Sequence, residues 1–153
     1  MRNIKLVAFG TIISSMSFLL ATPVNSESVK APCRIEVSLA HISKYILLKT
    51  GKQAVKVDAF SKCNVVQRKV TLTVELWKVG KIRNHLVVLR AKRSPGITLP
   101  GRQVENFNAF AFCKNYELTN YYGVAYSKAF IAGKWQFARH VLSLEIIPLE
   151  CGT

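Results

Sequence analysis

Acidic residues are scarce in this chain of 153 residues, which carries 8 Asp and Glu against 22 Lys and Arg and has a formal net charge of +14. Long apolar runs are also scarce. Only the N-terminal stretch has one, and a fifth of all residues are charged, which excludes a membrane protein with several spans. Half of the residues are hydrophobic, so the chain is not a disordered basic tail. Its length fits one ordinary domain of about 100–200 residues.

Residues 1–26 have the pattern of a secretory signal peptide. Two cations within the first five residues precede an uncharged apolar stretch over 6–21, and a short polar stretch with small residues follows. An uncleaved membrane anchor is the alternative, but the 16-residue core is short for a span of about 20 residues. We place cleavage after Ser26, with Ser28 nearly as good a site, and cleavage at either position predicts a secreted protein. Cleavage after Ser26 leaves one mature domain, 27–153, with a net charge of +12.

Apolar and polar residues alternate with a period of two along most of the mature domain, which is typical of strands with one buried face. No segment shows a helix cap followed by a helical apolar stripe. Glycine and proline turns separate the segments. We expect strands over 33–40, 45–49, 53–60, 69–77, 83–92, 103–114, 120–130 and 137–149, with turns at 79–81, 94–96, 100–101 and 132–134. This pattern predicts an all-β fold, an immunoglobulin-like antiparallel sandwich of about seven or eight strands.

All four cysteines lie in the mature domain and indicate two disulfides, because exported proteins usually pair an even number of cysteines. Their spacing has no Cys-x-x-Cys and no neighbouring His pair, so we expect neither a metal site nor a cofactor. If neighbouring strands run antiparallel, Cys33 and Cys63 share one end of the domain, and Cys113 and Cys151 share the other. We therefore favour the pairs Cys33–Cys63 and Cys113–Cys151. The pairing changes if 45–49 is a further full strand.

Several of these segments together resemble an uncharacterised group of small exported β proteins of actinobacteria. The shared features are the signal peptide, an early cysteine and a strand that ends in a second cysteine. They also include the segments 70–81, 109–113 and 121–126 and the terminal Cys151. The resemblance covers about residues 33–151. It implies an exported location and a β fold, and it implies no catalytic or binding residues.

Signatures of catalysis are missing from the mature domain, which holds one Asp, seven Glu and three His and lacks the common nucleophile, phosphate-loop and zinc-protease motifs. The best acid–base pair is Glu75 with His85, which lie opposite each other if the hairpin turn centres on Gly80. Such a pair among cations could serve a metal-independent ribonuclease or a secreted cationic toxin. An exposed salt bridge is the simpler interpretation. We therefore expect a protein that is not an enzyme.

Positive charge and aromatic residues lie in different halves of the mature domain. Residues 27–94 carry 15 cations and 4 acids, whereas 95–153 carry 5 and 4, and ten of the 13 aromatics lie over 107–137. The candidate anion-binding residues are Lys78, Lys81, Arg83, Arg90, Lys92 and Arg93. Outside a cell they could contact a cell-wall polymer, a polysaccharide, a nucleic acid or the cell surface itself. A solvated face that only keeps the protein soluble is the alternative.

Two further features suggest a partner protein. Tyr121, Tyr122 and Trp135 could form an exposed aromatic platform for a sugar or an extracellular protein, although packing in the core is the simpler interpretation. The loop over 93–97 could be the inserting element of an inhibitor or bacteriocin-like effector, although a plain connection is simpler. The sequence thus predicts a secreted binding protein whose basic face contacts an anionic polymer, a cell surface or an extracellular protein.

Overall fold

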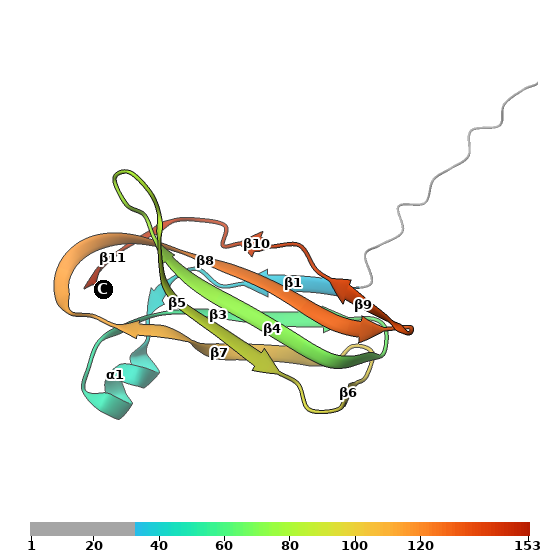
Figure 1. Cartoon of the computed structure of the whole chain (residues 1–153). Coiled ribbons are helices and arrows are strands. Elements are labelled where there is room, and N and C mark those ends of the chain that lie inside the picture. The colour runs from blue at the N-terminus through green and yellow to red at the C-terminus, as the bar shows by residue number, and fades with distance from the viewer. Residues whose placement is uncertain (1–32) are drawn as a thin grey trace, which may run out of the picture.

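Two antiparallel sheets and a short helix make up residues 33–153, the part that the computed structural model describes (Figure 1). The predicted signal peptide lies outside the described residues. In the first sheet, β3 (Ala54–Cys63) pairs along one edge with β7 (Gln103–Phe112). The other edge of β3 pairs with two strands, β1 (Cys33–Val37) and β2 (His41–Ile42).

The second sheet is built around two long strands, β4 (Gln67–Lys78) and β8 (Asn115–Ile131). The free edge of β4 pairs with β5 (His85–Arg93) and β6 (Ile97–Thr98). The free edge of β8 pairs in turn with three short strands: β9 (Lys134–Phe137), β10 (Val141–Leu142) and β11 (Ile147–Gly152).

The core lies between the two sheets and follows the predicted alternation. On β4 the buried apolar residues are Val70, Leu72, Val74 and Leu76, and β3 contributes Val55, Val57 and Ala59. The sheets pack tightly against each other at Gly123 of β8, where a Cβ atom would lie 2.5 Å from Cγ1 of Val57. The all-β prediction is confirmed. The immunoglobulin-like arrangement of the sandwich stays a prediction.

Both predicted disulfides are confirmed. Cys33–Cys63 joins β1 to β3, where the two cysteines are direct cross-strand partners. Cys113–Cys151 joins the residue that follows β7 to β11. Figure 1 shows the start of β1 and the C-terminus at opposite ends of the molecule. Each bridge closes a loop of 30 or 38 residues, which contributes about 3–4 kcal/mol in the chain-entropy model.

One predicted strand is wrong: residues 45–49 belong to the helix α1 (Lys44–Thr50). Ser43 caps its start, because its hydroxyl accepts a hydrogen bond from the Ile46 amide. Gly51 ends it in a left-handed conformation, at φ 69°. The seven residues bury only Ile46, so no apolar stripe marks the helix in the sequence, and its two caps are the signal that was missed.

The predicted last strand over 137–149 is also wrong as a single element. The predicted turn at 132–134 is present, with positive φ at both Ala132 and Gly133, and it leads directly into β9. The predicted strand is then interrupted twice, once between β9 and β10 and once between β10 and β11. All three of these short strands pair with β8. Alternation in the sequence therefore predicted that this segment pairs as a strand, but it did not predict the two interruptions.

Candidate functional site

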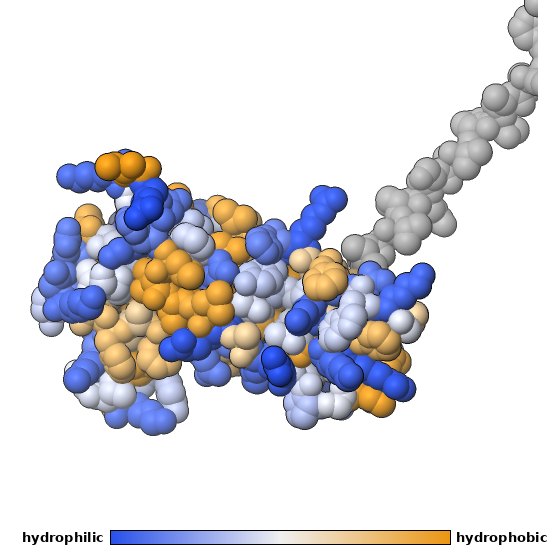
Figure 2. All heavy atoms as spheres, viewed as in Figure 1, coloured by the Kyte–Doolittle hydropathy of each residue, from blue (hydrophilic) through white to orange (hydrophobic). Residues whose placement is uncertain are grey.

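The connection between β4 and β5, residues 79–84, projects beyond the end of the sandwich (Figure 1). Lys81, Ile82 and Arg83 are all exposed, and the Ile82 side chain is 99% exposed. Figure 2 shows this projection as an apolar tip beside hydrophilic side chains. Together with β5 we name it the basic arm, residues 79–93. Because Ile82 is so exposed, it has no packing role within the domain.

β5 continues the positive charge away from this tip. Arg93 pairs with Thr71 on the outer face of the second sheet. Lys92 and Arg90 pair with the buried residues Leu72 and Val74 and so project from the opposite face. All three cations stay exposed because β5 is the edge strand of the described sheet. The arm therefore carries positive charge on both of its faces.

Carboxylates do not neutralise the basic arm within the described residues. The ion pairs of 33–153 join Arg34 to Glu36 and join both His41 and Lys56 to Asp58. Five of the six predicted anion-binding residues thus lie exposed on the arm without an acidic partner in this part of the chain: Lys81, Arg83, Arg90, Lys92 and Arg93. Their charge is free to act on an external anion.

Lys78 differs from the other five candidates. It is half-buried, and its Nζ atom donates a hydrogen bond to the main-chain oxygen of Thr153 at 2.6 Å. Lys78 therefore fastens the end of β4 to the C-terminus, a structural use that its position beside the turn did not indicate.

The predicted pair of Glu75 and His85 is not formed. The connection spans six residues, and the register shifts between Leu76 and Trp77, so His85 pairs with Lys78 and Glu75 pairs with Leu89. The Glu75 carboxylate instead accepts hydrogen bonds from the Trp77 indole at 2.7 Å and from the Tyr126 hydroxyl at 3.1 Å. The acid and the base proposed for a ribonuclease are therefore not opposite each other.

Glu75 affects the pKa of Tyr126 and is not paired with His85. The pKa of Tyr126 is raised above its usual 10.0, first by burial and then by the hydrogen bond and negative charge of Glu75, against a smaller opposing hydrogen bond with Thr73. The folded protein therefore holds the phenol proton more tightly than the unfolded chain does. The ring of His140 lies 4.3 Å from the Tyr126 ring, which makes this group a packed feature of the outer face.

The predicted aromatic platform is wrong for Tyr121. This residue is fully buried, and its hydroxyl donates a hydrogen bond to the main-chain oxygen of Cys151. Tyr122 instead stacks on Trp77, with ring centroids 6.2 Å apart, while Trp135 packs edge-on against Phe130 on the neighbouring strand. The three candidates do not share one surface. The pairing of β4 with β8 brings Trp77 opposite Tyr122, and alternation along a single strand does not reveal such a pairing.

The predicted inserting loop over 93–97 is tied to the sheet. Ile97 begins β6, and the Ser94 amide donates a hydrogen bond to the Val70 carbonyl at 2.9 Å. The hydroxyl groups of Ser94 and Thr98 lie 3.2 Å apart. These contacts fit a connection between strands.

No known protein family and no curated protein matches this chain. Within 33–153, no group of three or more His, Cys, Asp or Glu residues is placed to hold a metal ion. No helix in the same stretch is long and apolar enough to span a bilayer. The two disulfides suggest an oxidising, extracellular setting.

Proposed function

We propose that this protein is secreted and binds, without catalysing a reaction, to an anionic surface outside the cell through its basic arm. The observation that carries the proposal is the run of five exposed cations along the basic arm, two on the projecting connection and three on the edge strand β5, none of which has an acidic partner within 33–153. The two disulfides support an extracellular location. A solvated face that served only solubility would not need its charge gathered along one connection and one edge strand.

The tip favours a cell surface over a dissolved polymer. Each cation near an anionic membrane contributes about 1 kcal/mol of attraction. A fully exposed isoleucine that enters the apolar boundary adds about 1.5–3 kcal/mol. Ile82 lies between two such cations at the end of the projection, so charge and apolar contact would act at the same point. A polysaccharide or nucleic acid would use the charge alone.

Binding to vesicles tests this proposal. The oxidised mature protein is sedimented with vesicles of phosphatidylcholine, with or without phosphatidylglycerol, at about 0.15 M ionic strength, where charges are screened beyond about 8 Å. We expect binding only to the anionic vesicles. The double variant Lys81→Glu/Arg83→Glu should bind them more than about tenfold more weakly, because it replaces two attractions with two repulsions.

The matched control is Arg102→Glu/Lys134→Glu, which makes the same charge change at exposed cations outside the arm. An equal loss in both double variants would show that only net charge matters and would contradict the proposal. Ile82→Ser should weaken binding to vesicles but not to heparin, a soluble polyanion. If Ile82→Ser affects neither, the surface that the arm contacts is a polymer.

A further inference from the structure

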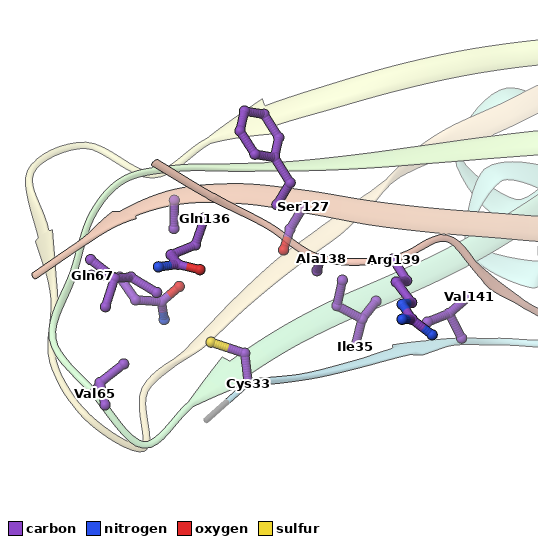
Figure 3. A pocket seen from close by; sticks show the side chains of 12 residues that line it. Cys33, Ile35, Val65, Gln67, Ser127, Gln136, Ala138, Arg139 and Val141 are labelled. Atoms are coloured by element: carbon purple, nitrogen blue, oxygen red, sulfur yellow. The ribbon is translucent and has the colours of Figure 1, made fainter. Parts of the chain in front are cut away.

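A cavity of about 520 Å³ lies between the two sheets at the end of the Cys33–Cys63 bridge (Figure 3). Its walls come from β1, from the second half of β8, from the start of β4 and from the stretch 136–141, which runs from the end of β9 to the start of β10. The volume lies within the range of about 300–1,000 Å³ that small-molecule sites occupy. None of the basic arm lines this cavity.

Small inward residues on β8 leave this space unfilled. Ser127 and Ala129 face the cavity, whereas Tyr121 fills the core at the other end of the same strand. On the opposite wall Ile35 of β1 lines the space. Protein interiors otherwise pack without voids larger than a water molecule, so a hollow of this size is space that a small molecule could enter.

One polar side chain in the wall lacks a partner. Gln67 is 1% exposed, and its Nε2 atom has no hydrogen-bond partner among the described residues. Figure 3 shows its amide in the cavity wall beside that of Gln136. A buried donor without an acceptor destabilises a protein by about 1–3 kcal/mol. The Nε2 atom itself has almost no exposed surface, so an acceptor supplied by a ligand would remove that cost once the amide turns to present Nε2 to the cavity.

A β-bulge aims this glutamine inward. Strict alternation from Val70 would turn Arg68 toward the core and Gln67 outward. The register shifts between Arg68 and Thr71, and Lys69 takes a left-handed conformation with φ 52°. Arg68 is consequently exposed and Gln67 is buried. Bulges of this kind often re-aim a side chain at functional positions, and a lysine in this conformation is itself unfavourable by about 1–2 kcal/mol.

We infer that the cavity binds a small lipophilic molecule with a neutral hydrogen-bond acceptor, such as a ketone, ester or lactone carbonyl, which accepts from Gln67 Nε2. The wall is mostly apolar and contains no Asp or Glu. Its one cation, Arg139, is exposed and lies away from Gln67, beyond Ile35 (Figure 3). An ionised head at Gln67 would be buried without a counter-charge, which is strongly unfavourable.

Displacement of a fluorescent probe tests the inference on the oxidised mature protein. N-phenylnaphthylamine, a neutral apolar dye, should bind saturably, and a long-chain methyl ketone should displace it. The carboxylate of equal chain length should bind about tenfold more weakly. In Gln67→Leu the dye should still bind, while the affinity for the ketone falls about tenfold relative to the affinity for the dye, since the donor is gone.

A variant that partly fills the cavity provides a second test. Ala129→Leu should weaken binding of dye and ketone, whereas Ala91→Leu, which adds the same side chain at an exposed position of β5, should bind both as the wild type does. Near-UV circular dichroism verifies that each variant is folded. The inference is overturned if the wild type does not bind the dye saturably or if Ala129→Leu binds it as tightly as the wild type does. It is also overturned if Gln67→Leu keeps the wild-type preference for the ketone.

Discussion

The two ends of the sandwich use the same central strand, β8, in opposite ways. At one end Tyr121 fills the core completely, and its hydroxyl contacts Cys151 and Thr153. At the other end Ser127 and Ala129 leave a cavity beside Gln67, whose Nε2 atom has no hydrogen-bond partner within 33–153. A disulfide bridges the chain at each end. Side-chain size on one face of one strand therefore decides whether the space between the sheets becomes core or cavity.

The largest expected effect is the loss of the ring at the filled end. Tyr121→Ala should lower the free energy of unfolding by about 3–5 kcal/mol, because it removes a fully buried aromatic side chain and leaves a void. Urea denaturation measures the change. Tyr116→Ala, at an exposed position of the same strand, should change stability by less than about 0.5 kcal/mol. Similar losses in the two variants would mean that Tyr121 does not hold this end together.

A smaller loss is expected at Gly123, where the two sheets pack tightly. Gly123→Ala should cost about 1–3 kcal/mol, because its new Cβ atom would lie 2.5 Å from Val57 and 2.9 Å from Val37. The double variant Gly123→Ala/Val57→Ala should recover part of the loss, since the first clash is then relieved. Thermal unfolding of both variants provides the measurement. An unaltered Gly123→Ala protein would show that the sheets can separate freely here.

The hollow end should respond with the opposite sign. Ala129→Leu adds more volume than Gly123→Ala on the same face of β8, yet it should leave stability unchanged or raise it by about 0.5–2 kcal/mol, because the cavity can receive the side chain. Urea denaturation under the same conditions as for Gly123→Ala makes the comparison direct. A loss of several kcal/mol in Ala129→Leu would mean that this end is packed like the other.

The smallest effect concerns the outer face and depends on pH. The pKa of Tyr126 is higher in the folded protein than its ordinary 10.0, so the folded state holds this proton more tightly than the unfolded state. The contribution of Tyr126 to stability is therefore complete below about pH 10 and is lost as pH rises through the folded pKa. Tyr126→Phe should show a shallower alkaline decline in thermal midpoint than the wild type. Equal declines would contradict this linkage.

Local alternation predicted the strands well and their pairing less well. It placed the apolar face of β4 correctly because every second residue of a strand faces the same way whatever its neighbours are. It misplaced Glu75 because the length of the 79–84 connection and the shift at Leu76 decide which residues meet across the hairpin. It placed Tyr121 among candidates for the surface because a strand with aromatics on both faces does not reveal which face the other sheet covers.

The sequence by itself determined the all-β class, both disulfide pairs and the gathering of positive charge before residue 95. These follow from composition, from period-two alternation and from the order of antiparallel strands, all of which are read along the chain. Only the tertiary structure decided the capped helix, the exposure of Ile82 at the tip, and the cavity around Gln67. Each of these depends on a bulge, a loop length or the packing of one sheet on the other, and such effects act between residues that are distant in the sequence.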